Sequence, residues 1–363
     1  MLVTNLYKTI TIEKLSHITN PIFIDLRSPG EYQTGHILNA MNIPIFDDDE
    51  RAEVGYTYKN IGVDAAKDLG LSIASKKLPD IVKKIRSLYT NKHTLILYCW
   101  RGGMRSRSIV SILELMGIPS FQLVGGYKGY RRHILDALEA FTVKPQIVLL
   151  CGSTGVGKSA LLHSLANHNI PVIDLEQLAN HRGSSFGQVG MGIPETAQNF
   201  DAKILEQLQM YNNSPYIVVE CESKRIGNVY LPDCLYTKMK TGLKILLYAD
   251  MEVRISRLIE EYTNNMHNRN MEELLTSLAS LGKRLGKKVI TQLTTDLKEG
   301  RLRNVVKVLL VDYYDPLYGY ERANQSGFNL TINCDNLDYA LKTVIAFLHE
   351  LVNKQPSGNM SRE

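Results

Sequence analysis

Residues 152–159, which read GSTGVGKS, constrain the fold of this chain more strongly than any other segment. They follow the apolar run QIVLL at residues 146–150 and precede a helical pattern formed by Leu161, Leu162 and Leu165. A G-x-x-x-x-G-K-[ST] pattern between an apolar strand and a helix is typical of a loop that binds phosphate groups. The sequence therefore predicts a strand, a phosphate loop and a helix in direct succession.

The residue types in this phosphate loop indicate how it would hold a ligand. Gly152, Gly155 and Gly157 allow successive backbone N–H groups to converge on phosphate oxygens at a helix N-terminus. Lys158 adds a positive charge, and Ser159 can ligate Mg²⁺. The motif predicts diphosphate binding, but it leaves open what the diphosphate is attached to and whether it is hydrolysed.

Two carboxylates in the same part of the chain are further candidates. Asp174 and Glu220 each end a short apolar run, VID and YIVVE. A carboxylate at the end of a strand can hold a metal ion or a water molecule, and it can equally cap a helix or lie on the surface. The sequence does not identify a metal.

Short apolar runs that alternate with helical patterns indicate two α/β units. A helical pattern runs from Ser106 until Gly117 and Pro119 stop it. The segment between residues 252 and 313 reads as mostly helical. The strands expected before the boundary near residue 140 are residues 22–26, 94–98 and 121–124, and those after it are residues 146–150, 172–174, 216–220, 244–248 and 330–333.

We therefore expect three parts in the chain. Residues 1–140 would form the first α/β domain, and residues 141–354 the phosphate-loop domain with a helical C-terminal part. The tail at residues 355–363, QPSGNMSRE, is expected to be disordered.

Composition narrows the class of protein. A chain of 363 residues that is 44% hydrophobic can bury two cores. The start shows no secretory signal, and no apolar run reaches the roughly 20 residues that span a bilayer, so we expect a soluble cytoplasmic protein. Five cysteines without a CxxC pair argue against a disulfide framework and a zinc site. The net charge of +5 is compatible with a polyanionic partner.

A second loop, CWRGGMRS at residues 99–106, lies between an expected buried strand and an expected helix. Helix N-terminal N–H groups and the guanidinium groups of Arg101 and Arg105 would favour the thiolate form of Cys99, which is the nucleophilic form. We therefore predict that Cys99, Arg101 and Arg105 are catalytic. The alternative, a cysteine that is merely buried at the end of a strand, leaves the two glycines and two arginines unexplained.

The first domain resembles rhodanese domains. The resemblance rests on DLRS at residues 25–28, on Glu31 and on GHI at residues 35–37, and it implies that Asp25 and Arg27 brace loops near the cysteine. The spacing between Cys99 and Arg105 is C-x5-R, one residue longer than the usual rhodanese spacing and similar to that of rhodanese-fold phosphatases. A wider loop admits a tetrahedral, phosphate-like anion.

The order of motifs is similar to that of the tRNA 2-selenouridine synthase family. The matching segments are CWRGGMRS, GGYKGYRR at residues 125–132, the phosphate loop, DLEQLANHRGSSFG at 174–187, ESKRIG at 222–227 and YYDPLY at 313–318. The resemblance implies conversion of wobble 2-thiouridine in tRNA to 2-selenouridine. The sulfur would first be alkylated by geranyl diphosphate, and selenophosphate, supplied by a selenophosphate synthetase, would then donate selenium.

The same resemblance assigns roles to the two loops. Residues 152–159 would grip the diphosphate of the prenyl donor, with Mg²⁺ as an optional ion, and Cys99 with its two arginines would serve the selenium step. No tightly bound cofactor is expected. His181 and Arg182, within a matching segment, would either contact substrate or brace a loop.

Basic residues indicate where tRNA phosphates would bind. Residues 280–309 hold eight Lys and Arg against two acidic residues. We expect tRNA contacts from Lys283, Arg284, Lys287, Lys288, Arg301 and Arg303, and as a second candidate surface from Lys128, Arg131 and Arg132. A solvated helical face is the alternative for each of them.

Two rival functions share these motifs. One is a rhodanese-fold phosphatase or sulfurtransferase fused to an ATP-using, kinase-like domain. The other is a non-catalytic module that senses nucleotides or binds RNA. Trp100 within the cysteine loop and the long matching segments favour the synthase over both.

Overall fold

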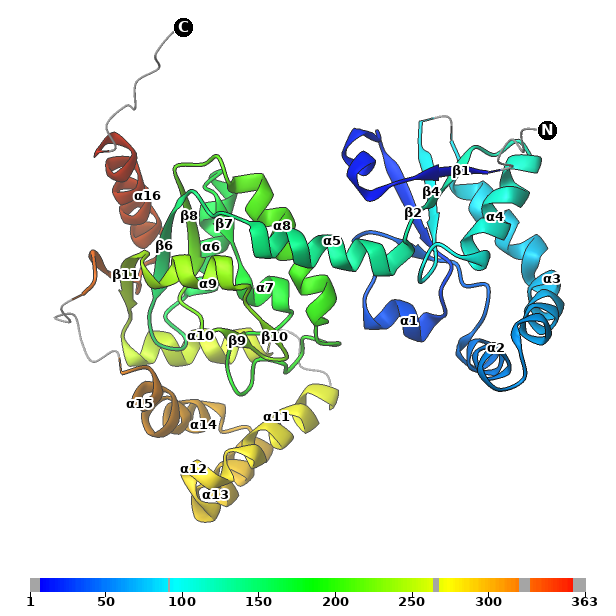
Figure 1. The fold of residues 1–363 in the computed structure, drawn as a ribbon. Helices are drawn as coiled ribbons and strands as arrows, with labels where there is room; N and C mark the ends of the chain where they lie inside the picture. Colours follow the sequence, from blue (N-terminus) through cyan, green and yellow to red (C-terminus); the bar gives the residue numbers. More distant parts are fainter. Residues whose placement is uncertain (1–6, 91, 264–267, 320–326, 355–363) are drawn as a thin grey trace, which may run out of the picture. The chain divides into compact units, whose positions relative to one another are not determined.

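The computed structural model describes residues 7–90, 92–263, 268–319 and 327–354 (Figure 1). The tail that was expected to be disordered, residues 355–363, lies outside the described residues. The chain divides into two compact units. The first comprises Met1–Ala140 and Thr196–Leu205, and the second comprises Phe141–Glu195 and Glu206–Glu363.

The first unit is built on a parallel sheet with the strand order β1-β5-β4-β2-β3. Its central strand, β4, has four consecutive buried residues, Leu95 to Tyr98, as expected for a strand covered on both faces. The three strands predicted from apolar runs are confirmed as β2, β4 and β5. The bounds are β1 (Lys8–Ile10), β2 (Pro21–Asp25), β3 (Met41–Asn42), β4 (Thr94–Tyr98) and β5 (Ser120–Leu123).

Helices complete the first unit, and of these only α4 was predicted from the sequence. The helix α2 begins with a capping box in which Asp47 and Glu50 bind each other's backbone N–H groups, and it packs against α3. The bounds are η1 (Ile12–His17), α1 (Pro29–Thr34), α2 (Asp48–Asn60), α3 (Val63–Leu88), α4 (Met104–Leu115) and α5 (Gly126–Ala140).

Residues 196–205 depart from the domain division drawn from the sequence, which placed them in the phosphate-loop domain. They include the first half of α8 (Ala197–Tyr211) and belong to the first unit. The reason is a set of polar contacts: Tyr127 donates to Gln198, and Asn199 accepts from the backbone N–H of His36. Contacts between residues so far apart in the sequence leave no local signal.

The second unit has its own parallel sheet, with the strand order β12-β11-β6-β8-β7. All five strands predicted for this part are present, and β7 ends one residue earlier than expected, before Asp174. The bounds are β6 (Gln146–Cys151), β7 (Val172–Ile173), β8 (Tyr216–Glu220), β11 (Leu243–Tyr248) and β12 (Leu330–Asn333); β9 (Arg225–Ile226) and β10 (Val229–Tyr230) form a separate antiparallel hairpin.

Helices around this sheet are α6 (Lys158–Asn167), α7 (Leu175–Ala179), α9 (Asp233–Lys240) and α16 (Leu337–Lys354). The helical segment predicted between residues 252 and 313 is confirmed for the residues that the structure describes, and its helices enclose a hydrophobic core of their own. It comprises α10 (Met251–Thr263), α11 (Asn268–Ser280), α12 (Gly282–Leu285), α13 (Lys287–Lys298), α14 (Leu302–Leu309), the π-helix η2 (Leu310–Tyr314) and α15 (Asp315–Tyr318).

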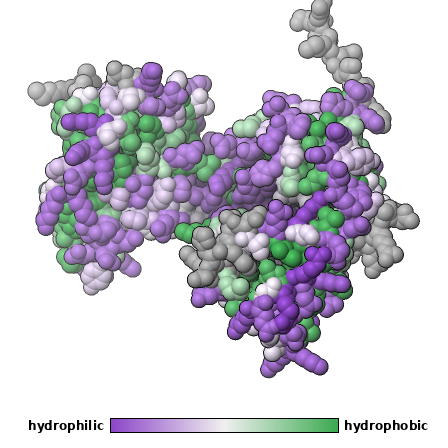
Figure 2. Space-filling view, turned by 180° about the vertical axis from the view of Figure 1, so that it is seen from behind, coloured by the Kyte–Doolittle hydropathy of each residue, from purple (hydrophilic) through white to green (hydrophobic). Residues whose placement is uncertain are grey.

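The predicted fold class, two parallel-sheet α/β domains with a helical C-terminal part, is confirmed. Figure 2 shows hydrophilic residues over most of the visible face of each unit, with smaller hydrophobic areas between them. Within the described part of the chain, none of the helices combines the length and the apolar character that a membrane crossing requires.

Candidate functional site

The phosphate loop leaves the C-terminal end of β6 and enters α6, as the sequence predicts. Gly152 has a φ of 153°, and a Cβ atom there would lie 2.5 Å from the carbonyl oxygen of Leu247. Gly157, with a φ of 97°, occupies the N-cap of α6 in the left-handed region. The backbone therefore approaches the neighbouring strand and turns into the helix only because these positions carry no side chain.

Lys158 and Ser159 begin α6 at this loop. The ammonium of Lys158 donates to the carbonyl oxygens of Gly152, at 2.8 Å, and Ser153, at 3.4 Å. The hydroxyl of Ser159 donates to Glu176 Oε2 at 3.2 Å. The charge of Lys158 is thus held within the loop, where backbone N–H groups at a helix start also favour an anion.

The two candidate carboxylates have different surroundings. Asp174 caps α7, because its side chain accepts from the backbone N–H of Gln177 at 2.8 Å. Glu220 is 1% exposed, and its Oε1 accepts from the backbone N–H of Glu176 at 2.6 Å. Its Oε2 has no hydrogen-bond partner among the described residues. Burial, with Asp174 nearby, raises the pKa of Glu220 well above its usual range.

The best-placed carboxylate at the phosphate loop is Glu176, which the sequence did not single out. Burial, followed by the charge of Glu222, raises its pKa to about 7. The oxygens of Ser159 and Glu176 suit Mg²⁺, which binds one or two protein oxygens together with phosphate oxygens and water. Within the described residues, no group of three or more His, Cys, Asp or Glu side chains is placed to hold a metal.

Two arginines of α10 brace the phosphate loop, and the sequence gave no local signal for either. Arg254 donates from Nε to the carbonyl oxygen of Thr154 at 2.9 Å and pairs with Asp315, with 2.5 Å between Nη2 and Oδ1. Arg257 donates to the carbonyl oxygen of Val156 at 2.9 Å. Backbone carbonyls of the loop are thereby held on the side of α10.

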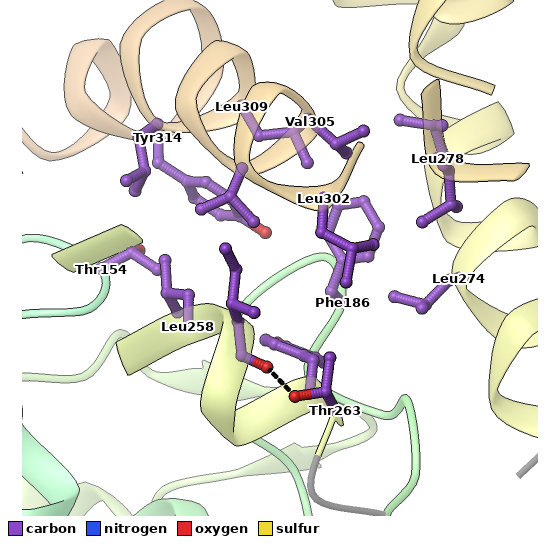
Figure 3. Close-up of a pocket in the computed structure, with 15 residues that line it drawn as sticks. Thr154, Phe186, Leu258, Thr263, Leu274, Leu278, Leu302, Val305, Leu309 and Tyr314 are labelled. Carbon is purple, nitrogen blue, oxygen red and sulfur yellow. Dashed lines mark hydrogen bonds between the residues drawn. The ribbon is translucent and has the colours of Figure 1, made fainter. Parts of the chain in front are cut away.

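An apolar cavity of about 70 Å³ adjoins the phosphate loop (Figure 3). Thr154 in the loop and Leu258 and Tyr262 on α10 line both this cavity and the pocket that contains Lys158. Figure 3 shows hydrophobic side chains directed into the cavity from α11, from α14 and from the segment after α7; they include Phe186, Leu274, Leu278, Leu302, Val305 and Leu309. A polar loop and an apolar chamber thus share one wall.

His181 and Arg182 brace the segment that lies between these features. The Nδ1 atom of His181 accepts from the backbone N–H of Gly183 at 3.0 Å, and burial lowers the pKa of His181, which favours the neutral ring. Arg182 pairs with Glu261, with 2.7 Å between Nε and Oε1, and lies over the ring of Tyr262. Arg182 also lines the pocket of the phosphate loop.

The cysteine loop in the first unit joins β4 to α4. Cys99 is 3% exposed, and its Sγ accepts from the backbone N–H of Gly103 at 3.3 Å and lies 3.3 Å from Ser106 Oγ. The start of α5 supports the loop, since Tyr127 and Lys128 donate backbone N–H groups to the carbonyls of Cys99 and Trp100. The sulfur therefore meets a backbone hydrogen-bond donor at the N-terminus of α4.

The two arginines of the loop differ in their surroundings. The guanidinium of Arg105 donates from Nη1 to Glu31 Oε2 at 2.8 Å, so a carboxylate already shares its charge. Arg101 is exposed to solvent. Beside them, Asp25 and Arg27 form a buried ion pair, and Arg27 also donates to the carbonyl oxygen of Gly35 at 2.7 Å. This pair has the bracing arrangement that the rhodanese resemblance implies.

The predicted tRNA contacts divide into exposed and paired residues. Lys283, Arg284, Lys287 and Lys288 are exposed on α12 and α13. Lys128 and Arg132 are exposed on α5.

The remaining candidates hold acidic partners. Arg131 pairs with Asp201, with 2.5 Å between Nη2 and Oδ2. Arg301 pairs with Asp296 and Glu299, and Arg303 pairs with Glu252.

Comparison with known proteins shows which families the two parts of the chain match. Residues 11–133 match the rhodanese-like domain family, and residues 145–338 match the AAA domain of tRNA 2-selenouridine synthase. A relative from Nitrosomonas europaea, described as tRNA 2-selenouridine synthase, is 36% identical over 68% of this chain, which spans 64% of that relative.

Two further relatives carry the same description. One, from Shewanella sp. strain MR-7, is 32% identical over 84% of this chain and 88% of its own length. Another, from Psychromonas ingrahamii, is 31% identical over 82% of this chain and 87% of its own length. Since one family match spans more than half of the chain and these relatives align with most of it, the chain belongs to the tRNA 2-selenouridine synthase family, a family of tRNA-modifying transferases.

Proposed function

We propose that this protein replaces sulfur by selenium at C2 of wobble 2-thiouridine in tRNA, by way of S-geranyl-2-thiouridine. Geranyl diphosphate and selenophosphate are the co-substrates, and a selenophosphate synthetase supplies the latter. The reaction is assigned to the cytoplasm, where tRNA is modified. The observation that carries the prenyl step is the apolar cavity that shares Thr154, Leu258 and Tyr262 with the phosphate-loop pocket.

This shared wall suits an apolar chain attached to a diphosphate. Apolar cavities stay dry and take up apolar molecules, and each buried methylene contributes about 0.8 kcal/mol. A volume of about 70 Å³ holds roughly five water-sized groups, because each needs about 10–15 Å³. That space matches the outer, five-carbon unit of a geranyl chain, with the inner unit directed to the loop. A nucleotide base would need polar partners there, so this feature disfavours the ATP-using rival.

In the alkylation step, the sulfur of 2-thiouridine attacks C1 of the geranyl group. The bond between C1 and the diphosphate oxygen breaks, the diphosphate leaves with the electron pair, and the N3 proton passes to solvent. Lys158 and the backbone N–H groups of residues 152–159 stabilise the negative charge that develops on the leaving group. Mg²⁺, when bound by Ser159 and Glu176, would offset part of the same charge.

The cysteine loop is assigned to the selenium step. The backbone N–H of Gly103 donates to Cys99 Sγ at the start of α4, and such surroundings favour a thiolate and an anionic donor such as selenophosphate. Arg101 and Arg105 add positive charge beside this loop, the latter shared with Glu31. Geranylation assists the exchange, because a geranyl thiol departs from C2 more easily than sulfide does.

Exposed basic residues supply the tRNA contacts in this proposal. Lys283, Arg284, Lys287 and Lys288 form the first surface, since their charges face solvent. Lys128 and Arg132 form the second. Arg131, Arg301 and Arg303 contribute less, because acidic partners already neutralise them.

Purified protein given thiolated tRNA, geranyl diphosphate and selenophosphate tests the proposal, with nucleosides analysed by mass spectrometry. Wild type should yield S-geranyl and selenium-containing uridine. Cys99→Ala should lose selenation and keep most geranylation, whereas Lys158→Ala should lose geranylation. Equal loss of geranylation in both variants would contradict separable sites, and a wild type without either product would favour the phosphatase or sulfurtransferase rival.

A further inference from the structure

Gln122, on β5, forms hydrogen bonds with the cysteine loop. Its side chain is 4% exposed. Its amide nitrogen, Nε2, donates to the carbonyl oxygens of Gly102, at 2.7 Å, and Gly103, at 3.2 Å, and to Ser106 Oγ at 2.9 Å. Backbone carbonyls only accept hydrogen bonds, so the group that faces them is the NH2 of the amide.

This arrangement determines what the hydroxyl of Ser106 can do. Ser106 is fully buried, and its Oγ lies 3.3 Å from Cys99 Sγ and 3.3 Å from the carbonyl oxygen of Gly103. Because Oγ accepts from Gln122, its single proton is free for one of these two acceptors. A thiolate attracts that proton more strongly than a neutral carbonyl, since charge-assisted hydrogen bonds are about twice as strong.

We infer that Ser106 and Gln122 are positioning residues that stabilise the thiolate of Cys99: the Ser106 hydroxyl donates to Sγ, and Gln122 holds that hydroxyl in place. The backbone N–H of Gly103 donates to the same sulfur at 3.3 Å. When the sulfur is protonated, the Ser106 proton turns to the carbonyl of Gly103. Nothing in the reaction sequence assigned above requires this pair. Its importance for selenium transfer rests on the proposed function, whereas its effect on the thiol does not.

Charged groups around the loop set the background against which this pair acts. Asp25 and Arg27 at the end of β2 neutralise each other, and so do Glu31 on α1 and Arg105 on α4. Burial raises the pKa of Tyr127 on α5 to about 12, so that ring stays neutral. Arg101 on the loop and Lys128 near the start of α5 are exposed to solvent. Changes at Ser106 or Gln122 leave all of these groups in place.

The rate at which iodoacetamide alkylates Cys99 in the full-length protein, followed on its peptide by mass spectrometry as a function of pH, tests this inference. Loss of a hydrogen bond to a charged group in Ser106→Ala should move the midpoint up by about one pH unit. Gln122→Met should move it in the same direction by less. Ser106→Thr, which keeps the hydroxyl, should restore the wild-type midpoint. Ser108→Ala is the matched control, because Ser108 is exposed on the same helix and donates to Arg105 O.

Thermal unfolding of each variant separates a local effect from a folding defect. If Ser106→Ala does not fold, Gln122→Met decides the matter by the same measurement. Profiles of the folded variants that coincide with wild type would overturn the inference. A shifted midpoint in Ser106→Ala, combined with a wild-type protein that never selenates tRNA, would uphold the positioning role and reject the proposed function.

Discussion

Arg254 holds the carbonyl oxygen of Thr154 at 2.9 Å from its Nε, and so couples the phosphate loop to α10. The same helix carries Leu258, one turn further along, in the wall of the apolar cavity. Asp315 fixes the guanidinium by two hydrogen bonds. A single helix therefore contacts the phosphate loop and lines the cavity beside it.

Replacing Arg254 by methionine should damage both stability and diphosphate binding. The change breaks a largely buried ion pair with Asp315, which costs about 3 kcal/mol, and it frees the carbonyl of Thr154. We expect the KM for geranyl diphosphate to rise about tenfold, as measured by steady-state geranylation of thiolated tRNA. Arg303→Met is the matched control. Arg303 lies exposed on α14 and pairs with Glu252 of α10, the helix that also carries Arg254. An unchanged KM in Arg254→Met would show that the bracing has no bearing on substrate.

Filling the cavity should select against the prenyl chain. Leu297 and Leu293 lie one turn apart on α13, and both are buried, but only the former lines the cavity. In Leu297→Phe the added ring should displace about two methylenes of substrate, a loss of roughly 1.6 kcal/mol that corresponds to about a tenfold rise in KM. Inhibition by inorganic diphosphate should not change. A similar rise in KM in Leu293→Phe would count against the cavity as the chain site.

The pair between Glu31 and Arg105 predicts a pH-dependent contribution to stability. Burial raises the pKa of Glu31, but the hydrogen bonds and charge of Arg105, with help from Ser28 and Arg51, outweigh it and leave the pKa below its ordinary value. A depressed carboxyl pKa stabilises the fold above the unfolded value of about 4.3, and this contribution is lost as pH falls through the folded value.

Thermal unfolding from pH 7 to pH 3 measures this contribution. Glu31→Gln should be less stable than wild type by about 1 kcal/mol at pH 7, and the difference should shrink towards pH 3. The control is Asp64→Asn, because Asp64 and Lys67 pair on the exposed surface and such pairs contribute little. A gap between wild type and Glu31→Gln that stays constant with pH would mean that the ion pair is not its source.

Binding of tRNA should depend on exposed rather than paired basic residues. The double variant Lys287→Gln/Lys288→Gln should weaken binding and reduce the slope of log affinity against log salt by about 0.7–0.9 for each lost phosphate contact. Arg303→Gln should alter the slope little, because Glu252 already pairs with Arg303. Filter binding at several salt concentrations measures both slopes, and equal slopes in wild type and the lysine variant would exclude this surface.

Helix α2 illustrates where sequence reasoning fell short although a signal was present. Asp47 and Glu50 form a capping box at its start, a spacing that can be recognised in the sequence. The helix itself has few apolar residues and so lacks the periodicity by which α4 was recognised. Its packing against α3 is a tertiary contact.

The sequence by itself determined the two loops and the strands that lead into them. The features by which residues 152–159 and 99–106 are proposed to bind anions are glycines, backbone N–H groups and adjacent helix starts, and all of these are local in the chain. The strands β4 and β8 could be recognised from their own residues, because a strand that is buried on both faces is a continuous apolar run.

Only the tertiary structure decided which distant residues serve those loops. Gln122 reaches Ser106, and Arg254 reaches Thr154 across 100 residues, because parallel strands and α10 bring them together. The pairing of Arg105 with Glu31 arose in the same way. A side chain's partner depends on packing between elements far apart in the chain, and no local pattern records that packing.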